Sequence, residues 1–319
     1  MTCQKPYHKH LLFKLFLLFC VLAPSPVAAG VRVAVSIAPI HSLVASVMAG
    51  ASQPDLIVRQ NVSPHNYQLT PSKALQLSRT DLVIWIGEDF ERALGKVIRT
   101  LPKKITRLAL DAAGCAVFEE GRDLHIWLNP VLAICLVRKI RTVLVRLDGE
   151  HADLYRENAR LLIARLTMLD HELATQLAPL KGKKYLVFHD AYTRFEKHYG
   201  LKSAGFFRLT PERLSGARHI ARLRRKIARA EISCIFTEPG FIPAQVRGII
   251  RETGLRSGVL DPLGARLKPG PALYFQLMRN LARNLRGCLM ARKRSNKKAD
   301  PGFPASAFSR YFACLVTDQ

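Results

Sequence analysis

The chain has 319 residues, 49% of them hydrophobic and 23% charged, a balance typical of folded globular proteins that excludes a chain disordered throughout. Its length is that of two domains of ordinary size. Only one apolar run approaches membrane length, at the N-terminus, which excludes a protein with many membrane spans. The chain contains 49 lysines and arginines against 24 aspartates and glutamates, which gives a net charge of +25. Such a charge makes nucleic acid and anionic membranes partners to consider.

The first 29 residues have the pattern of a signal peptide. Three lysines precede the apolar stretch 15–23, Pro24 and Pro26 interrupt that stretch, and the small residues of 27–29 follow it. An uncleaved membrane anchor is the alternative, but the apolar core is short for a span. We therefore expect export to the periplasm and removal of residues 1–29.

Short apolar and β-branched runs alternate with helical patterns along the chain, which predicts parallel α/β units. The predicted strands are 31–36, 55–59, 81–87, 105–110, 184–188, 203–207, 232–236 and 257–260. Helical patterns lie at 40–48, 71–77, 89–100, 191–199, 211–229, 243–253 and 274–287. The predicted fold is α/β, with two lobes that each hold a mostly parallel four-stranded sheet flanked by helices.

One long helical pattern separates the two groups of strands. Its apolar residues recur every three or four positions and are Tyr155, Ala159, Leu162, Leu166, Leu169, Leu173 and Leu177. Such a stripe predicts a single rigid helix that bridges the lobes. We expect an N-terminal lobe at 30–148, a connecting helix at 149–180, a C-terminal lobe at 181–288, and a basic, disordered tail at 289–319.

The positive charge is spread over the chain. The signal sequence contributes +3 and the tail +4, so +18 remains on the body between them. The densest patch is 218–229, where the apolar residues Ile220, Leu223 and Ile227 recur at helical spacing. This pattern predicts an amphipathic helix with a solvated basic face. Because no aromatic residues are interleaved there, a nucleic-acid interface is not expected.

Three of the ten histidines stand in distinctive local settings. His65 and His189 follow predicted strands, as Asp261 does, and His125 lies in the segment RDLHIWLNP. Ligands of open parallel sheets bind outside the carboxyl ends of the strands. Three imidazoles and one carboxylate suit zinc better than magnesium or calcium. On composition alone, three unrelated histidines are an equal alternative.

Five cysteines follow the signal sequence, namely Cys115, Cys135, Cys234, Cys288 and Cys314. In an oxidising compartment this number favours one or two disulfide bonds and leaves at least one thiol unpaired. Spacing alone does not decide the pairing. Because no C-x-x-C motif occurs, neither a zinc ribbon nor a thioredoxin-type redox site is expected.

An ordered set of motifs narrows these alternatives. Six motifs occur in the order found in periplasmic zinc-binding proteins of the ZnuA type. They are SPHNYQLTPS, DLVIWIG, HIWLNP, FHDAYTRFEKHYGL, FTEPGFIPAQV and LDPLG. The chain resembles this family, the solute-binding components of zinc ABC importers, over roughly residues 31–288. The resemblance implies two α/β lobes bridged by a long helix, with the metal between the lobes.

The resemblance also implies roles for individual residues. His65, His125 and His189 match the three histidine ligands. Asp261 in LDPLG matches the carboxylate that completes the site in related members. Apart from the resemblance, we take Glu238, in the motif FTEPGFIPAQV, as a candidate that contacts the ligands without binding the metal itself.

A disulfide between Cys234 and Cys288 is a further implication of the resemblance, and it leaves Cys115 as a loop thiol and Cys135 as a small buried apolar residue. Three features depart from the family, one of them the charge of +18 on the body together with the tail after Cys288. Pro64 stands where some members have a glutamate just before the first ligand. Many members have a His-rich loop before the second ligand, whereas the corresponding segment here contains no histidine.

The implied function is capture of Zn²⁺ in the periplasm and its delivery to a zinc ABC permease in the inner membrane. We expect a monomer that binds no nucleic acid and is not an enzyme. A manganese or iron carrier of the same fold is the near alternative, but manganese-binding relatives have a glutamate where His189 stands, and carboxylates suit manganese. A zinc hydrolase with Glu238 as general base is the alternative from a different class, and no H-E-x-x-H motif supports it.

Overall fold

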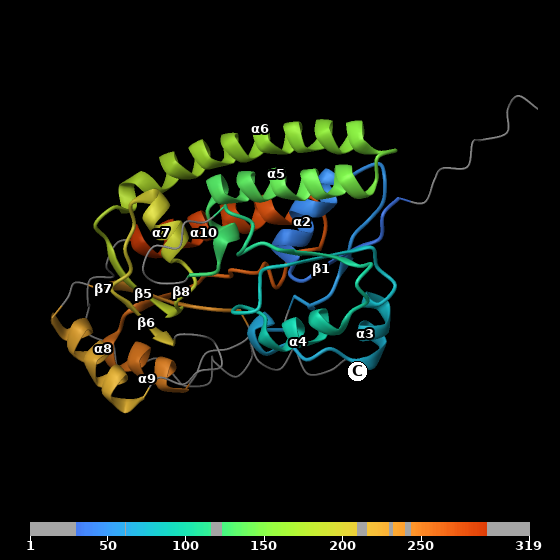
Figure 1. Ribbon diagram of the computed structural model, residues 1–319. Helices are drawn as coiled ribbons and strands as arrows, with labels where there is room; N and C mark the ends of the chain where they lie inside the picture. Colours follow the sequence, from blue (N-terminus) through green and yellow to red (C-terminus); the bar gives the residue numbers. More distant parts are fainter. Residues whose placement is uncertain are drawn as a thin grey trace, which may run out of the picture. The chain divides into compact units, whose positions relative to one another are not determined.

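The structure is a computed structural model that describes residues 30–60, 62–115, 123–208, 216–229, 232–239 and 244–291 (Figure 1). The predicted signal sequence and nearly all of the predicted basic tail lie outside the described residues. Within the ranges given, no helix is both long enough and apolar enough to cross a membrane.

The described residues form eight short strands in two parallel sheets, as the sequence predicts. The first sheet has the order β2-β1-β3-β4 and contains β1 (Val33–Val35), β2 (Asp55–Leu56), β3 (Leu82–Trp85) and β4 (Thr106–Ala109). The second has the order β6-β5-β7-β8 and contains β5 (Lys184–His189), β6 (Gly205–Arg208), β7 (Ile232–Thr237) and β8 (Arg256–Val259). Neighbouring strands are parallel throughout, so the carboxyl ends of each sheet lie along one edge.

Helices cover both sheets. The first half of the chain forms α2 (Ala38–Val47), α3 (Pro71–Leu77), α4 (Arg92–Thr100), α5 (Pro130–Leu147) and α6 (Ala152–Leu177). The second half forms α7 (Thr193–Tyr199), α8 (Ala217–Arg229), α9 (Ala244–Thr253) and α10 (Leu273–Leu289). Short 3₁₀ helices lie at η2 (Pro64–Asn66), η3 (Ile126–Leu128) and η4 (Ala178–Leu180).

The helices pack on the sheets in layers. α4 lies on one face of the first sheet, where Leu94 and Trp85 belong to one apolar cluster. α8 and α9 cover one face of the second sheet through a separate cluster that includes Leu223 and Ile249. The other faces of both sheets share one large core with α2, α5, α6 and α10, and α5 and α6 run side by side above it (Figure 1). This shared core holds the two sheets together.

α6 is the long helix that the apolar stripe predicts. Its buried residues are the seven of that stripe, Tyr155, Ala159, Leu162, Leu166, Leu169, Leu173 and Leu177. They pack against α2, α5 and α10. The helix runs without interruption from Ala152 to Leu177 and continues into η4, which confirms the predicted bridging helix.

α5 is a helix that the predicted elements do not include. Asn129 caps it, because its side-chain oxygen accepts hydrogen bonds from the N–H groups of Val131 and Leu132, and Pro130 occupies the first turn. The buried face, at Ala133, Leu136, Val137, Ile140 and Leu144, does recur at helical spacing. Exposed apolar residues such as Val131 and Leu147 extend the apolar run beyond that face and obscure the period in the sequence.

Candidate metal centre

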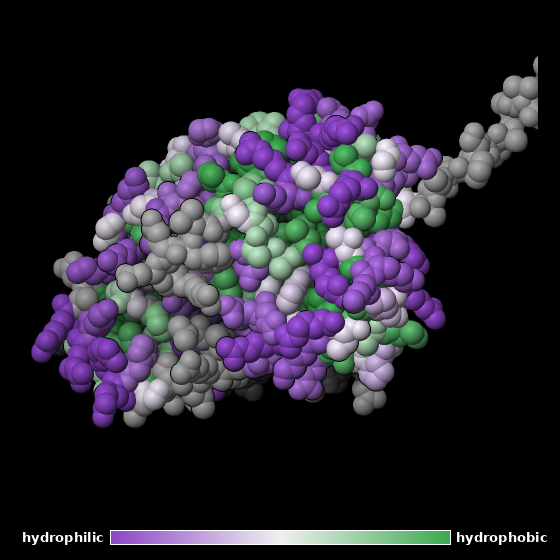
Figure 2. Space-filling view, in the orientation of Figure 1, coloured by the Kyte–Doolittle hydropathy of each residue, from purple (hydrophilic) through white to green (hydrophobic). Residues whose placement is uncertain are grey.

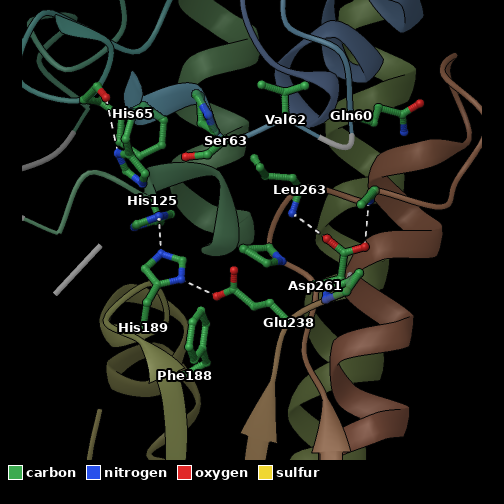
Figure 3. A pocket seen from close by; sticks show the side chains of 15 residues that line it. Gln60, Val62, Ser63, His65, His125, Phe188, His189, Glu238, Asp261 and Leu263 are labelled. Carbon is green, nitrogen blue, oxygen red and sulfur yellow. Dashed lines mark hydrogen bonds and ion pairs between the residues drawn. The ribbon is translucent and has the colours of Figure 1, made fainter. Parts of the chain in front are cut away.

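Three histidines meet near the carboxyl edges of the two sheets. His189 is the last residue of β5, and His65 lies in η2, in the connection that follows β2. His125 immediately precedes η3. Although they come from three distant parts of the chain, the three rings lie next to one another in Figure 3.

The nitrogen atoms of these rings are close enough to share one ion. One nitrogen of each ring lies within 4.8 Å of those of the other two, and the Nε2 atoms of His125 and His189 are 3.3 Å apart. Tetrahedral zinc with Zn–N bonds of ~2 Å separates its ligand nitrogens by roughly 3.3 Å. His125 and His189 are buried and His65 is half-buried, so the group is already drawn together and shielded from water.

Carboxylates orient two of the rings. Nδ1 of His125 lies 2.8 Å from Oδ1 of Asp123, and Nδ1 of His189 contacts Oε1 of Glu238. An Nδ1–H group that donates to a carboxylate leaves Nε2 with its lone pair and makes it a better metal ligand. Glu238 therefore lies beside a ligand candidate rather than among the converging nitrogens.

His65 is oriented by backbone and by packing. Its Nδ1 lies 3.3 Å from the carbonyl oxygen of Phe90, and its ring packs on the Phe90 ring with centroids 4.4 Å apart. Burial, together with the neighbouring His125 and His189, lowers the pKa of His65 to about 3. The ring is therefore neutral near neutral pH, the form in which an imidazole binds a metal ion.

Asp123 is a site residue that the sequence reasoning missed. Besides His125 Nδ1 it accepts the His125 N–H at 2.9 Å and the Arg194 N–H at 3.0 Å, while its carbonyl oxygen accepts from Nε of Arg194 at 3.1 Å. Because Arg194 belongs to α7, this buried aspartate fastens the segment that carries His125 to the second lobe. Burial alone raises the pKa of Asp123, but the hydrogen bonds from His125 and Arg194 outweigh that effect and lower it. A carboxylate two residues before a candidate ligand was the signal available in the sequence.

Asp261 lies in the same pocket but outside the group of three histidines. Its Oδ1 accepts from the N–H groups of Leu263 at 3.0 Å and Gly264 at 2.8 Å, and its Oδ2 accepts from Ala265 at 2.6 Å. Burial raises the pKa of Asp261, the three backbone hydrogen bonds counteract this, and nearby Glu238 raises it further. In Figure 3 Glu238 lies between His189 and Asp261. In this structure Asp261 stabilises the turn after β8.

The pocket around the histidines is built from both lobes. Gln60, which follows β2, donates from Nε2 to the carbonyl oxygens of Gly264 at 2.7 Å and Leu267 at 2.6 Å. Trp127 donates from Nε1 to the carbonyl oxygen of Pro262 at 2.8 Å. Gln60 and Pro262 line the histidine pocket, and Gly264 stands in the chain between two residues that line it, Leu263 and Ala265. Hydrogen bonds across the lobes therefore hold its walls in place.

The side chains of four of the five remaining described histidines have other partners, among them that of His151, whose Nδ1 lies 3.0 Å from Asp148. The buried Nε2 of His41 lies 2.9 Å from the carbonyl oxygen of Pro54, and Nε2 of His198 lies 2.6 Å from Asp170. His219, on α8, contacts the carbonyl oxygen of a residue in β6. In the part of the chain that the structure describes, His65, His125 and His189 alone form a group able to hold a metal ion.

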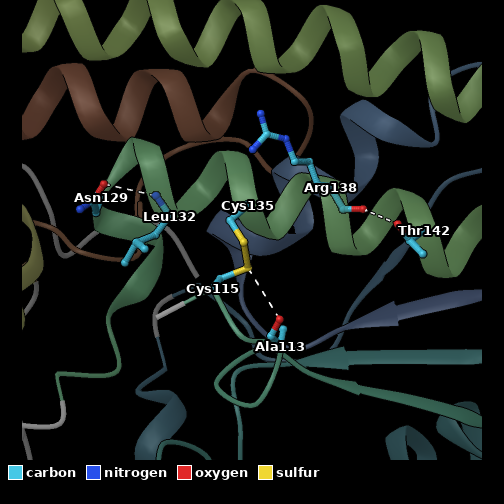
Figure 4. The surroundings of a disulfide bond; sticks show 7 residues. All are labelled: Ala113, Cys115, Asn129, Leu132, Cys135, Arg138 and Thr142. Atoms are coloured by element: carbon cyan, nitrogen blue, oxygen red, sulfur yellow. Dashed lines mark hydrogen bonds between the residues drawn. A yellow bond between two sulfur atoms is a disulfide. The ribbon is translucent and has the colours of Figure 1, made fainter. Parts of the chain in front are cut away.

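The described residues contain two disulfide bonds. Cys234 of β7 is bonded to Cys288 of α10 with Cα atoms 6.2 Å apart, the pair that the resemblance implies. Cys115 is bonded to Cys135 of α5 with Cα atoms 5.6 Å apart (Figure 4). The prediction that these last two are a loop thiol and an unpaired buried residue is wrong, because α5, which the predicted elements lack, brings Cys135 beside the segment after β4.

The chain is similar to known proteins over most of its length. Residues 33–288 match the family model for ZnuA, zinc-uptake complex component A, periplasmic. The high-affinity zinc uptake system protein ZnuA of Brucella abortus (strain 2308) is 38% identical over 304 residues, which cover 81% of this chain and 91% of that protein. The protein of the same name from Paracoccus denitrificans (strain Pd 1222) is 31% identical over 300 residues, with 82% and 92% covered.

Solved structures share the fold. A crystal structure of ZnuA matches with a TM-score of 0.72 at 22% identity and covers 82% of this chain and 99% of its own. The Zn(II)-bound ZnuA-like domain of Streptococcus pneumoniae AdcA matches with a TM-score of 0.68 at 23% identity and covers 82% and 100%. These matches confirm the predicted architecture of two parallel four-stranded sheets flanked by helices.

Proposed function

Because the chain belongs to the ZnuA family of periplasmic zinc-uptake components, we propose that it captures Zn²⁺ in the periplasm and delivers the ion to an ABC permease in the inner membrane. The observation that carries the proposal is the convergence of His65, His125 and His189, whose nitrogens lie within 4.8 Å of one another. Proteins of this family are transport components and not enzymes, so the ion is cargo.

The ligand set favours zinc over manganese. Three imidazole nitrogens make a borderline-soft site, whereas manganese prefers carboxylate and water oxygens. Two carboxylates contact the rings, and both do so at Nδ1: Asp123 contacts His125, and Glu238 contacts His189. They add negative charge around the ion without replacing nitrogen as the donor.

We assign the fourth coordination position to Asp261. Its carboxylate lines the same pocket, and a carboxylate has about four lone-pair directions, of which three are occupied by backbone N–H groups here. Asp261→Ala should weaken zinc binding less than loss of a histidine, because a water molecule can take its place.

Capture is tested by competition between the metal-free protein and a chromogenic chelator. We expect one Zn²⁺ per chain, and we expect His65→Ala, His125→Ala and His189→Ala each to weaken binding by at least about tenfold. His171→Ala, at an exposed position on α6, is the matched control and should bind as the wild type does. A triple alanine variant with unchanged stoichiometry and affinity would refute the assignment, and a preference for Mn²⁺ in the same assay would refute zinc as the cargo.

Delivery is tested separately, with the permease in lipid vesicles. Zinc-loaded protein should stimulate ATP hydrolysis and zinc entry, whereas the triple alanine variant should do neither. Protein that binds zinc tightly and stimulates neither process would contradict delivery and leave capture intact. Sequencing of the N-terminus of the exported protein tests the proposed removal of residues 1–29, and light scattering tests the proposed monomer.

A further inference from the structure

A hollow at the amino end of β5 is lined by four exposed lysines, Lys183, Lys184, Lys202 and Lys226. The other described residues that line it are glycine, serine and alanine, so the lining contains no carboxylate. Lys184 begins β5, and the candidate ligand His189 ends it. The hollow therefore lies at the opposite edge of the sheet from the metal centre, roughly 16 Å away along the strand.

Lys226 also belongs to α8, whose exposed side is entirely basic apart from alanines. We call this side the α8 basic face; its members are Arg218, Arg222, Arg224, Arg225, Lys226 and Arg229, all of them exposed. The apolar residues of the helix, with Leu223 at their centre, pack into the cluster beneath. In Figure 2 the surface at the lower left, over α8, is strongly hydrophilic. The hollow and the α8 basic face are thus one continuous positive surface.

This charge is poorly compensated within the described residues. Arg224 pairs with Glu252 at 3.2 Å, and Lys226 donates to the carbonyl oxygen of Ala204 at 2.6 Å. No other member of the α8 basic face has a carboxylate partner in the part of the chain that the structure describes. Because Arg222 and Lys226 are four residues apart, as are Arg225 and Arg229, like charges repel along the helix. An anionic counterpart would relieve that repulsion.

The composition of the surface points to the kind of counterpart. Protein interfaces are organised around aromatic or large apolar residues, and single-stranded nucleic acid stacks on aromatic side chains. The exposed residues of α8 other than the basic ones are alanines, such as Ala221 and Ala228. A lipid surface needs only accessible cations near its headgroups. We propose that the lysine hollow and the α8 basic face form a docking surface for the anionic phospholipid headgroups of a membrane, separate from the zinc centre.

Vesicle co-sedimentation of the zinc-loaded, exported protein tests the proposal. We expect binding to vesicles of phosphatidylglycerol and phosphatidylcholine, release by added salt, and no binding to vesicles of phosphatidylcholine alone. Lys202→Glu/Arg222→Glu/Lys226→Glu should weaken binding by at least about tenfold. Arg138→Glu/Lys139→Glu/Arg146→Glu changes three exposed basic residues of α5 by the same total charge and should weaken it by less than about threefold.

Zinc affinity is measured for both variants and should be unchanged, which shows that they are folded. If the glutamate variant loses zinc affinity, the corresponding glutamine variant replaces it. Equal losses in both charge variants would overturn the proposal, because binding would then follow net charge alone. The proposal would also be overturned if inorganic phosphate released the protein from the vesicles more than chloride does at equal ionic strength. Tighter binding to an oligonucleotide than to anionic vesicles would overturn it as well.

Discussion

At the scale of single residues, the metal centre depends on what holds each imidazole at Nδ1. Asp123 and Glu238 hold His125 and His189, and the carbonyl oxygen of Phe90 holds His65. These contacts select the tautomer that presents Nε2. The buried Asp123 and the half-buried Glu238 also place negative charge next to the position of a divalent ion, which lowers the cost of removing that ion from water.

Asp123→Asn tests the role of that carboxylate. Asparagine retains the size of the side chain and an oxygen for the Arg194 N–H, but it removes the negative charge that strengthens the hydrogen bond to His125. We expect zinc affinity to fall by about 10- to 100-fold, measured by chelator competition. Asp153→Asn, at an exposed position on α6, is the control. Wild-type affinity in Asp123→Asn would show that the aspartate only packs the loop.

Glu91 gives the stability of the fold a pH dependence. It is fully buried, and its Oε2 accepts the Ile86 N–H at 2.8 Å. Burial raises the pKa of Glu91 from 4.5 to about 7. The folded chain thus keeps a proton that the unfolded chain loses above the lower value, so the stability that this group contributes is complete below pH 4.5 and is lost as the pH rises through about 7.

Glu91→Gln should therefore stabilise the protein in alkaline solution. Glutamine keeps the acceptor for Ile86 and cannot ionise, so its melting temperature should exceed that of the wild type at about pH 8 and approach it at about pH 5. The gain in the free energy of unfolding is at most about 3 kcal/mol. Thermal melts of the metal-free wild type and variant across this pH range measure the gain. A difference in melting temperature that does not change with pH would show that Glu91 is not the titrating group.

At the scale of elements, the segments that follow strands carry the site, and covalent bonds and caps hold them. Cys115 follows β4 and is joined to α5, whose start is held by Asn129 (Figure 4). His125 lies between these two anchors in the sequence. The disulfide bond and the helix cap therefore fix the chain on both sides of the second candidate ligand.

Removal of the Cys115–Cys135 bond should cost stability and zinc affinity together. The bond closes a loop with a sequence separation of 20. In the chain-entropy model, such a bond stabilises the folded state by about 3 kcal/mol. Cys115→Ser/Cys135→Ser should lower the melting temperature and weaken zinc binding, because the loop that this disulfide bond closes contains His125. Cys234→Ser/Cys288→Ser is the comparison, and it should lower stability by about 4 kcal/mol with a smaller effect on zinc. Equal effects on zinc in the two variants would contradict a local role for the first bond.

At the scale of the whole molecule, the two lobes are joined by more than α6. Ser42 of α2 donates to the carbonyl oxygen of Pro271 at 3.1 Å and accepts the Tyr274 N–H at 3.0 Å. The Tyr274 hydroxyl donates to the carbonyl oxygen of Trp127 at 2.7 Å. With the shared core and a helix that has no interior Gly or Pro, these bonds oppose a hinge between the lobes.

We therefore expect zinc to change loops and not the arrangement of the lobes. Small-angle scattering of the metal-free and zinc-loaded protein should give the same radius of gyration within error. Hydrogen exchange should slow on loading in the segments around His65 and His125, where ordering requires few contacts. A clear decrease in the radius of gyration on loading would contradict this expectation and would place the protein among carriers that close over their ligand.

The amino-acid sequence by itself determined the eight strands and the bridging helix, because alternation and helical spacing are properties of nearby residues. It singled out three histidines by their local settings, and the ordered motifs, through their resemblance to a family, made them candidates for one site. The tertiary structure decided which distant groups meet. Cys115 reaches Cys135 only because α5 packs beside the first sheet, and Asp123 reaches Arg194 only because the two lobes touch. Asp261 directs its oxygens to the backbone of its own turn, since buried N–H groups need acceptors.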